Sequence, residues 1–138
     1  GGMTVTLAFC VDDRGGLSFN RRRQSRDRAV SADLLSQAGG CTLWVEPYSR
    51  PLFPQEAEHI RTAEEPWTQA GPEDFCFLEL TGPGPALERA DQLILYRWNR
   101  HYPSDQRIAL PPEGWTLTGR TEFPGYSHDV ITKEIYQR

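Results

Sequence analysis

Apolar runs along the chain predict four buried strands. The run at residues 5–11 holds seven apolar or β-favouring residues and ends at two aspartates, which is typical of a strand covered on both faces. Shorter apolar runs at 42–45, 75–80 and 92–98 predict three more strands. Continuous apolar runs, rather than alternating ones, favour a parallel sheet with helices on both faces.

A helix is predicted over residues 26–38, after the first strand. Val30, Leu34 and Ala38 recur at a spacing of four and give one apolar stripe. Ser25 is the predicted N-cap, and two glycines end the helix. Weaker patterns predict helical turns at 48–53, at 64–70 and just before residue 89, and an edge strand at 58–62.

The C-terminal part has the pattern of an antiparallel hairpin. Apolar residues dominate the odd positions of 115–123 and polar residues the even ones, which is the period of a half-exposed strand. Residues 124–128 turn the chain, and 129–137 return as the partner strand. The sequence therefore predicts an α/β fold with a mostly parallel central sheet that this hairpin closes.

Length and composition predict one domain over residues 3–138, with the two glycines before Met3 as a cloning remnant. Apolar residues make up 38% of the chain and charged residues 25%, which excludes disordered and fibrous proteins. No run approaches the roughly 20 apolar residues of a membrane span, so we expect a cytoplasmic protein. The cysteines lie in or beside apolar runs and are predicted to be free, buried thiols: Cys10, Cys41 and Cys76.

Positive charge gathers in one segment although the net charge is −4. Six arginines lie within 14–28, accompanied by a single acidic residue, Asp27. Arginine side chains are suited to phosphate or carboxylate, and the start of the following helix adds to the positive field. The alternative is a solvated basic loop in which Asp27 pairs with Arg23 or caps the helix.

The candidate site combines this segment with the end of the second predicted strand. Asp27 is the candidate catalytic residue. The candidate ligand-binding residues are Asn20, Arg21, Arg22, Arg23, Gln24 and Ser25, together with Glu46, Tyr48 and Ser49.

The order of elements resembles the dihydrofolate reductase fold over most of the chain. Residues 8–12, followed by two glycines, are similar to that family's first strand and glycine-bearing loop, and 90–95 is similar to the approach to a later strand. Trp115 and the two closing strands match the family's ending. The resemblance implies that Asp27 stands where the family carries its substrate-binding carboxylate.

Two segments depart from the cofactor motifs of that family. Where the family has Gly-Arg-x-Thr, this chain has Glu46-Pro47-Tyr48-Ser49; a glutamate repels phosphate and Pro47 has no N–H. Where the family has paired glycines, Gly82 and Gly84 alternate with prolines. The resemblance thus implies a scaffold without its NADPH anchors, and no cofactor is expected. An NADPH-dependent reductase with a rearranged cofactor site is the alternative.

A second resemblance points to RNA. The segments at 19–27, 96–100 and 127–134 resemble small proteins labelled ribonuclease Z. The metal cluster of that nuclease needs neighbouring histidines, and the three histidines here are far apart in sequence, so no metal is expected. The alternative function is an RNA-binding or RNA-processing module, or a protein-interaction module, with Arg97, Arg100 and His101 as contacts. The aromatic residues between them are more typical of a strand's core face.

Two further combinations of residues carry chemistry. Ser127-His128-Asp129 contains the residue types of a hydrolase triad, but neighbours on a turn rarely point together, so we predict turn structure. Glu46 and Asp27 could form an acid–base pair of carboxylates. A salt bridge from Glu46 to one of the arginines is the favoured alternative.

The expected function follows from the arginine segment and the altered cofactor motifs. We expect a divergent protein with a dihydrofolate reductase-like fold that is not an active reductase. It is expected to bind a small anionic or nucleotide-like ligand at the arginine-rich segment.

Overall fold

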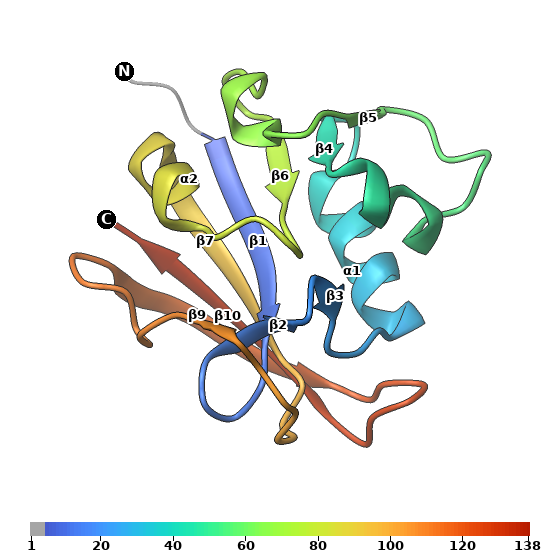
Figure 1. Cartoon of the computed structure of the whole chain (residues 1–138). Coiled ribbons are helices and arrows are strands. Elements are labelled where there is room, and N and C mark those ends of the chain that lie inside the picture. Colours follow the sequence, from blue (N-terminus) through green and yellow to red (C-terminus); the bar gives the residue numbers. More distant parts are fainter. Residues whose placement is uncertain (1–4) are drawn as a thin grey trace.

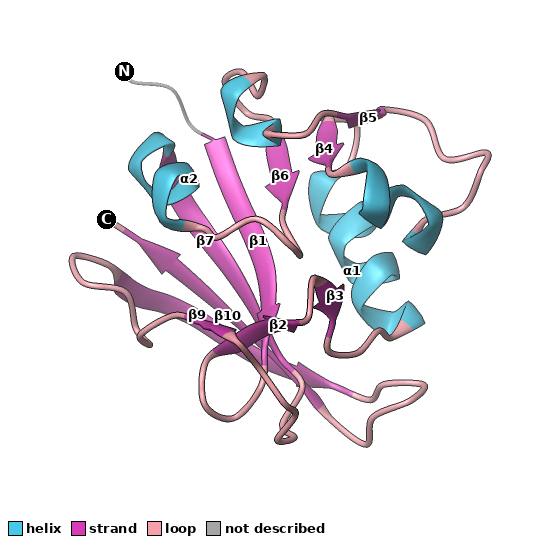
Figure 2. Ribbon diagram, in the orientation of Figure 1, coloured by secondary structure: helices cyan, strands magenta, loops and turns pink. Residues whose placement is uncertain are grey.

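The structure, a computed structural model, describes residues 5–138 (Figures 1 and 2); the glycines predicted to be a cloning remnant lie outside them. Its centre is a seven-stranded sheet in the order β5-β4-β6-β1-β7-β10-β9. The first five strands are parallel to one another. β10 runs in the opposite direction and pairs antiparallel with both β7 and β9. The strands are β1 (Val5–Val11), β4 (Leu43–Val45), β5 (Ile60–Thr62), β6 (Phe75–Phe77), β7 (Ala90–Arg97), β9 (Thr116–Phe123) and β10 (Ile131–Gln137). The predicted mostly parallel sheet with a closing hairpin is confirmed.

Helices cover both faces of this sheet, as predicted. They are α1 (Arg28–Ala38), α2 (Gly84–Arg89) and the short 3-10 helices η1 (Pro47–Leu52) and η2 (Pro66–Thr68). Alternate side chains of β1 enter two separate cores because successive residues of a strand point to opposite faces. Leu7 lies in the core that contains Ala86 of α2, whereas Ala8 lies in the core that contains Leu34 of α1.

The arginine segment, predicted as a loop, is a hairpin. β2 (Gly16–Phe19) pairs with β3 (Arg22–Arg23) on one side and with β8 (Gln106–Arg107) on the other, in a small second sheet. Asn20 and Arg21 form the two-residue turn with φ of 52° and 58°, the positive values that tight hairpin turns require. These strands are too short for their sequence pattern to reveal them.

Two predicted boundaries were wrong. Asp27, not Ser25, caps α1: its backbone is extended and its carboxylate accepts the N–H of Ala29 at 2.9 Å. Strand β6 ends at Phe77, three residues early. The N–H of Leu78 still donates to Ala8 O of β1, but those of residues 79–81 bond to the Glu46 carboxylate instead of a neighbouring strand.

The cysteines are free, as predicted; Cys76 is buried and the other two are half-buried. Burial raises the pKa of the Cys76 thiol. Within residues 5–138, no helix is long and apolar enough to span a membrane.

Candidate functional site

A groove lies over the arginine hairpin. It has a volume of about 240 Å³, and its lining residues are Phe19, Asn20, Arg22, Arg23, Gln24, Tyr102 and Pro103. The Phe19 ring is 48% exposed. Within residues 5–138 the exposed guanidinium of Arg22 forms no ion pair. The groove therefore offers positive charge and an aromatic face to solvent.

Gln24 lines both this groove and a small crevice beside Trp98, and its side chain has one unsatisfied acceptor. Its Nε2 donates to Asp12 Oδ2 at 3.0 Å and to the Pro103 carbonyl at 3.2 Å, while its buried Oε1 has no hydrogen-bond partner. Buried polar atoms are normally paired, and this one, being buried, is out of reach of a molecule that fills only the open groove. At the hairpin turn, the Asp105 carboxylate accepts the N–H of Asn20 at 2.9 Å.

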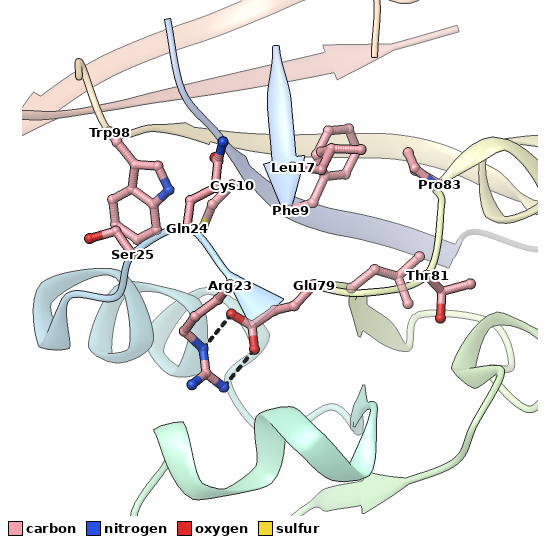
Figure 3. A pocket seen from close by; sticks show the side chains of 11 residues that line it. Phe9, Cys10, Leu17, Arg23, Gln24, Ser25, Glu79, Thr81, Pro83 and Trp98 are labelled. Atoms are coloured by element: carbon pink, nitrogen blue, oxygen red, sulfur yellow. Dashed lines mark hydrogen bonds and ion pairs between the residues drawn. The ribbon is translucent and has the colours of Figure 1, made fainter. Parts of the chain in front are cut away.

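The Arg23 side chain points toward Glu79 (Figure 3). Its Nε and Nη2 donate to the two oxygens of Glu79 at 2.9 and 3.0 Å. The guanidinium also lies 4.2 Å from the centre of the Tyr48 ring. Burial alone lowers the pKa of Arg23, but the Glu79 carboxylate outweighs it and raises that pKa. Arg23 is thus a structural ion-pair residue.

The space between the arginine hairpin and η1 is filled by side chains. The Ser49 hydroxyl donates to Glu79 at 2.7 Å, and Tyr48 accepts the N–H of Arg23 at 3.2 Å. On the other side of the Arg23–Glu79 ion pair, a crevice that reaches Trp98 has a volume of about 10 Å³, roughly room for one water. Tyr48 and Ser49 therefore belong to a packed network and do not line the open groove.

Glu46 is buried, and its carboxylate accepts four hydrogen bonds from the segment that follows β6. The donors are the N–H groups of Glu79, Leu80 and Thr81, at 2.6, 3.0 and 3.0 Å, and the Thr81 hydroxyl, at 2.6 Å. The expected salt bridge from Glu46 to an arginine was wrong, since Arg23 pairs with Glu79 and Glu46 takes backbone donors.

This carboxylate bears directly on the NADPH alternative. With the Gln106 amide oriented to suit its neighbours, the next N–H, that of Gly82, also has an internal acceptor, Gln106 Oε1, at 3.0 Å. Four consecutive N–H groups at the sheet edge, from residues 79 to 82, are therefore already satisfied inside the protein. Backbone N–H groups hold a phosphate only when they are free. The residues here do not fit a dinucleotide phosphate.

Asp27 is fully enclosed. Its carboxylate accepts the N–H groups of Ala29, Tyr126, Ser127 and His128 at 2.8–3.2 Å and lies 3.0 Å from His128 Nδ1. Burial raises the pKa of this carboxyl, but the hydrogen bonds outweigh it and lower the pKa to about 2. Asp27 and Glu46 share no hydrogen-bond partner, so the structure does not assemble the two carboxylates into a pair.

His128 joins Asp27 to a cluster of hydroxyl groups. Its Nε2 lies 3.1 Å from Ser25 Oγ and 2.9 Å from the Tyr102 hydroxyl, and the Trp98 indole stacks on its ring at 4.7 Å. No sequence signal links these residues, because Ser25 and His128 are 103 positions apart. Ser127 and Asp129 lie in the turn, as predicted.

The residues of the RNA alternative differ in their exposure to solvent. Arg97 is half-buried and pairs with Glu134 at 2.6 Å, while Arg100 and His101 are exposed beyond β7. Tyr96 and Trp98 are buried, which confirms their predicted place in the core.

Comparison with known proteins finds similarity to solved structures. No family model matches the chain, and no curated protein matches it. The structure of dihydrofolate reductase from Enterococcus faecalis, complexed with NADP(H) and RAB-propyl, is similar with a TM-score of 0.64 at 10% identity. The match covers 98% of this chain and 96% of that one. This chain therefore has a dihydrofolate reductase-like fold.

Proposed function

We propose that this protein binds a small anionic, nucleotide-like molecule in the groove over the arginine hairpin, and that it is not a reductase. The observation that carries the proposal is the exposed, unpaired guanidinium of Arg22, which lines the same groove as the exposed Phe19. Together they favour a ligand that has a negative group and a flat ring.

The groove's chemistry narrows the ligand class. Arg22 offers a fork of donors for phosphate or carboxylate. The exposed Phe19 ring offers a face on which a heterocycle can stack. A volume of about 240 Å³ lies below the roughly 300–1,000 Å³ of common ligand pockets, which favours one ring with one anionic group.

The reductase alternative is disfavoured by Glu46. Its carboxylate occupies the N–H groups at the carboxyl end of β6, where the fold resemblance implies that cofactor phosphates lie. The test is tryptophan fluorescence, with Trp44 as the expected reporter. We expect no quenching by millimolar NADPH; quenching that saturates would support a rearranged cofactor site.

The binding proposal is tested with uridine 5′-monophosphate, which has one imide N–H and one phosphate, against uridine as the neutral control. Calorimetry should detect the nucleotide and not the nucleoside. A nucleotide concentration of 100 times the dissociation constant should stabilise the protein by about 2.7 kcal/mol.

Variants locate the site. Arg22→Ala and Phe19→Ser should each weaken binding at least tenfold, because they remove the charge and the stacking face. Arg61→Ala, an equally exposed arginine on edge strand β5, is the matched control and should leave binding unchanged. The proposal fails if no nucleoside monophosphate binds, or if Arg22→Ala and Arg61→Ala behave alike.

A further inference from the structure

Ser25, His128 and Asp27 form a hydrogen-bonded series that the binding proposal does not use. Ser25 Oγ lies 3.1 Å from His128 Nε2, and His128 Nδ1 lies 3.0 Å from Asp27 Oδ2. The series runs from hydroxyl through imidazole to buried carboxylate. That is the order in which serine hydrolases generate a nucleophile, and it recurs on unrelated folds.

The hydrogen bonds of Asp27 favour one position for the proton of the neutral His128 imidazole. Asp27 is held as a carboxylate by four backbone N–H donors, so it accepts from Nδ1 of the imidazole. In the neutral ring Nε2 is then the acceptor. The Tyr102 hydroxyl lies 2.9 Å from Nε2 and 3.3 Å from Ser25 Oγ; when it donates to Ser25 Oγ, the Ser25 hydroxyl proton is directed to Nε2, and that is the reactive arrangement.

The imidazole is fixed in this orientation from two sides. The Trp98 indole stacks on it with an interplanar angle of 20°, and the Asp27 side chain is wholly buried behind it. Gly125 allows the turn to approach this closely, since a Cβ there would lie 2.6 Å from Asp27 Oδ2. A base preorganised in this way needs little rearrangement to take a proton.

Ser25 is accessible whereas His128 and Asp27 are not. It is half-buried and lines two adjoining crevices, each of about 10 Å³. In Figure 3 its hydroxyl lies beside Trp98, at the opposite end of the crevice from Thr81 and Pro83. Because each crevice has room for only about one water, an acyl group can reach the hydroxyl only if the surrounding side chains move aside, which favours a compact group.

We propose that Ser25 is a nucleophile that accepts a small acyl group, such as acetyl, from an ester. Ser25 Oγ forms a bond to the acyl carbon as the bond from that carbon to the leaving oxygen breaks. The Ser25 proton passes to His128 Nε2 and then to the leaving alkoxide. Water hydrolyses the acyl-serine by the reverse path. Asp27 stays ionised and acts as a positioning residue. This activity is independent of ligand binding in the arginine groove.

The test uses p-nitrophenyl acetate with the full chain. We expect a burst of nitrophenolate of up to one equivalent per protein, and mass spectrometry should place one acetyl group on Ser25. The competing nucleophiles are few, since Lys133 is the only lysine in the sequence. An acetyl group found only on Lys133, a cysteine or the amino terminus would overturn the proposal, as would the absence of a burst.

Two serine variants separate activation from simple exposure. Ser25→Ala should abolish the burst, whereas Ser36→Ala, which changes an exposed serine of α1, should leave it intact. His128→Gln should slow acylation at least about 100-fold, the usual contribution of a general base. An unchanged rate in His128→Gln would show that the hydroxyl is not activated.

Asp27→Asn tests positioning. With circular dichroism confirming the fold, the acylation rate constant should fall about 100-fold while the half-saturating ester concentration stays the same. Should Asp27→Asn fail to fold, Ser25→Ala and His128→Gln still decide the proposal. Equal acylation rates in folded Asp27→Asn and wild type would exclude the positioning role.

Discussion

Two neighbouring regions at the same end of the sheet differ in whether their charged side chains have partners within the protein. Inside, the carboxylates of Glu46, Glu79 and Asp27 are each satisfied by donors from the protein itself. Outside, the guanidinium of Arg22 faces a groove of about 240 Å³ and has no acidic partner in residues 5–138. A charged group that is already paired holds the fold together, whereas an unpaired one can recruit a ligand.

Removal of the Glu46 carboxylate, one of the paired groups, should have the largest effect on stability. Glu46→Ala leaves three backbone N–H groups and the Thr81 hydroxyl without their acceptor, and we expect it to lower the free energy of unfolding by about 3–5 kcal/mol. Urea unfolding measures the loss. Sulfate should restore part of the stability of the variant by occupying the freed donors.

Glu122→Ala, an exposed glutamate on β9, is the matched control for this change. It should alter stability by less than about 0.5 kcal/mol and should gain nothing specific from sulfate. Equal stabilisation of both variants by sulfate would mean that the donors after β6 do not form an anion site.

Acid should reveal the contribution of Asp27. Its pKa of about 2 in the folded protein lies below the ordinary value of 3.8. The stabilisation, about 2 kcal/mol, is therefore present above pH 4 and is lost as the pH falls through 2. Urea unfolding between pH 5 and 2 should show this loss. Asp27→Asn should remove that part of the pH dependence; an unchanged profile would contradict the assignment.

Within the hairpin, Arg23→Lys tests whether Arg23, unlike Arg22, contributes to stability. Lysine keeps the charge but loses the paired donors to Glu79 and the contact with the Tyr48 ring. We expect a loss of about 1–2 kcal/mol in the free energy of unfolding. A change below measurement error would place Arg23 with the solvated arginines.

Arg22→Ala should have the smallest effect on stability, less than about 0.5 kcal/mol, because the side chain is exposed and unpaired. The two substitutions lie one residue apart, and only that of Arg23 should move the urea midpoint. A loss of more than 1 kcal/mol in Arg22→Ala would show that Arg22 has a structural role.

Regular patterns in the sequence were sufficient for the sheet and insufficient for the site. Long apolar runs such as 92–98 and the alternation at 115–123 specify strands locally, so the parallel sheet and its closing hairpin could be predicted. Strand β3 has two residues and no pattern of its own. Strand β3 forms because the turn of Asn20 and Arg21 places it beside β2.

Partners within the site depend on three-dimensional proximity. The arginine cluster drew attention to residues 20–25, but nothing in it distinguishes Arg23, which turns inward to Glu79, from Arg22. Glu79 itself follows an apolar run and carries no motif. Likewise the serine next to His128 in sequence is Ser127, whereas the serine beside its ring is Ser25.

The Asp27 carboxylate has a consequence for how this molecule opens. It holds the first turn of α1 and the turn before β10 at the same time, although these lie about a hundred residues apart in sequence. Neither end can fray without releasing the other, so the helix start and the C-terminal hairpin form one cooperative unit. The amide hydrogens of Ala29 and Ser127 should therefore exchange with solvent through the same opening event.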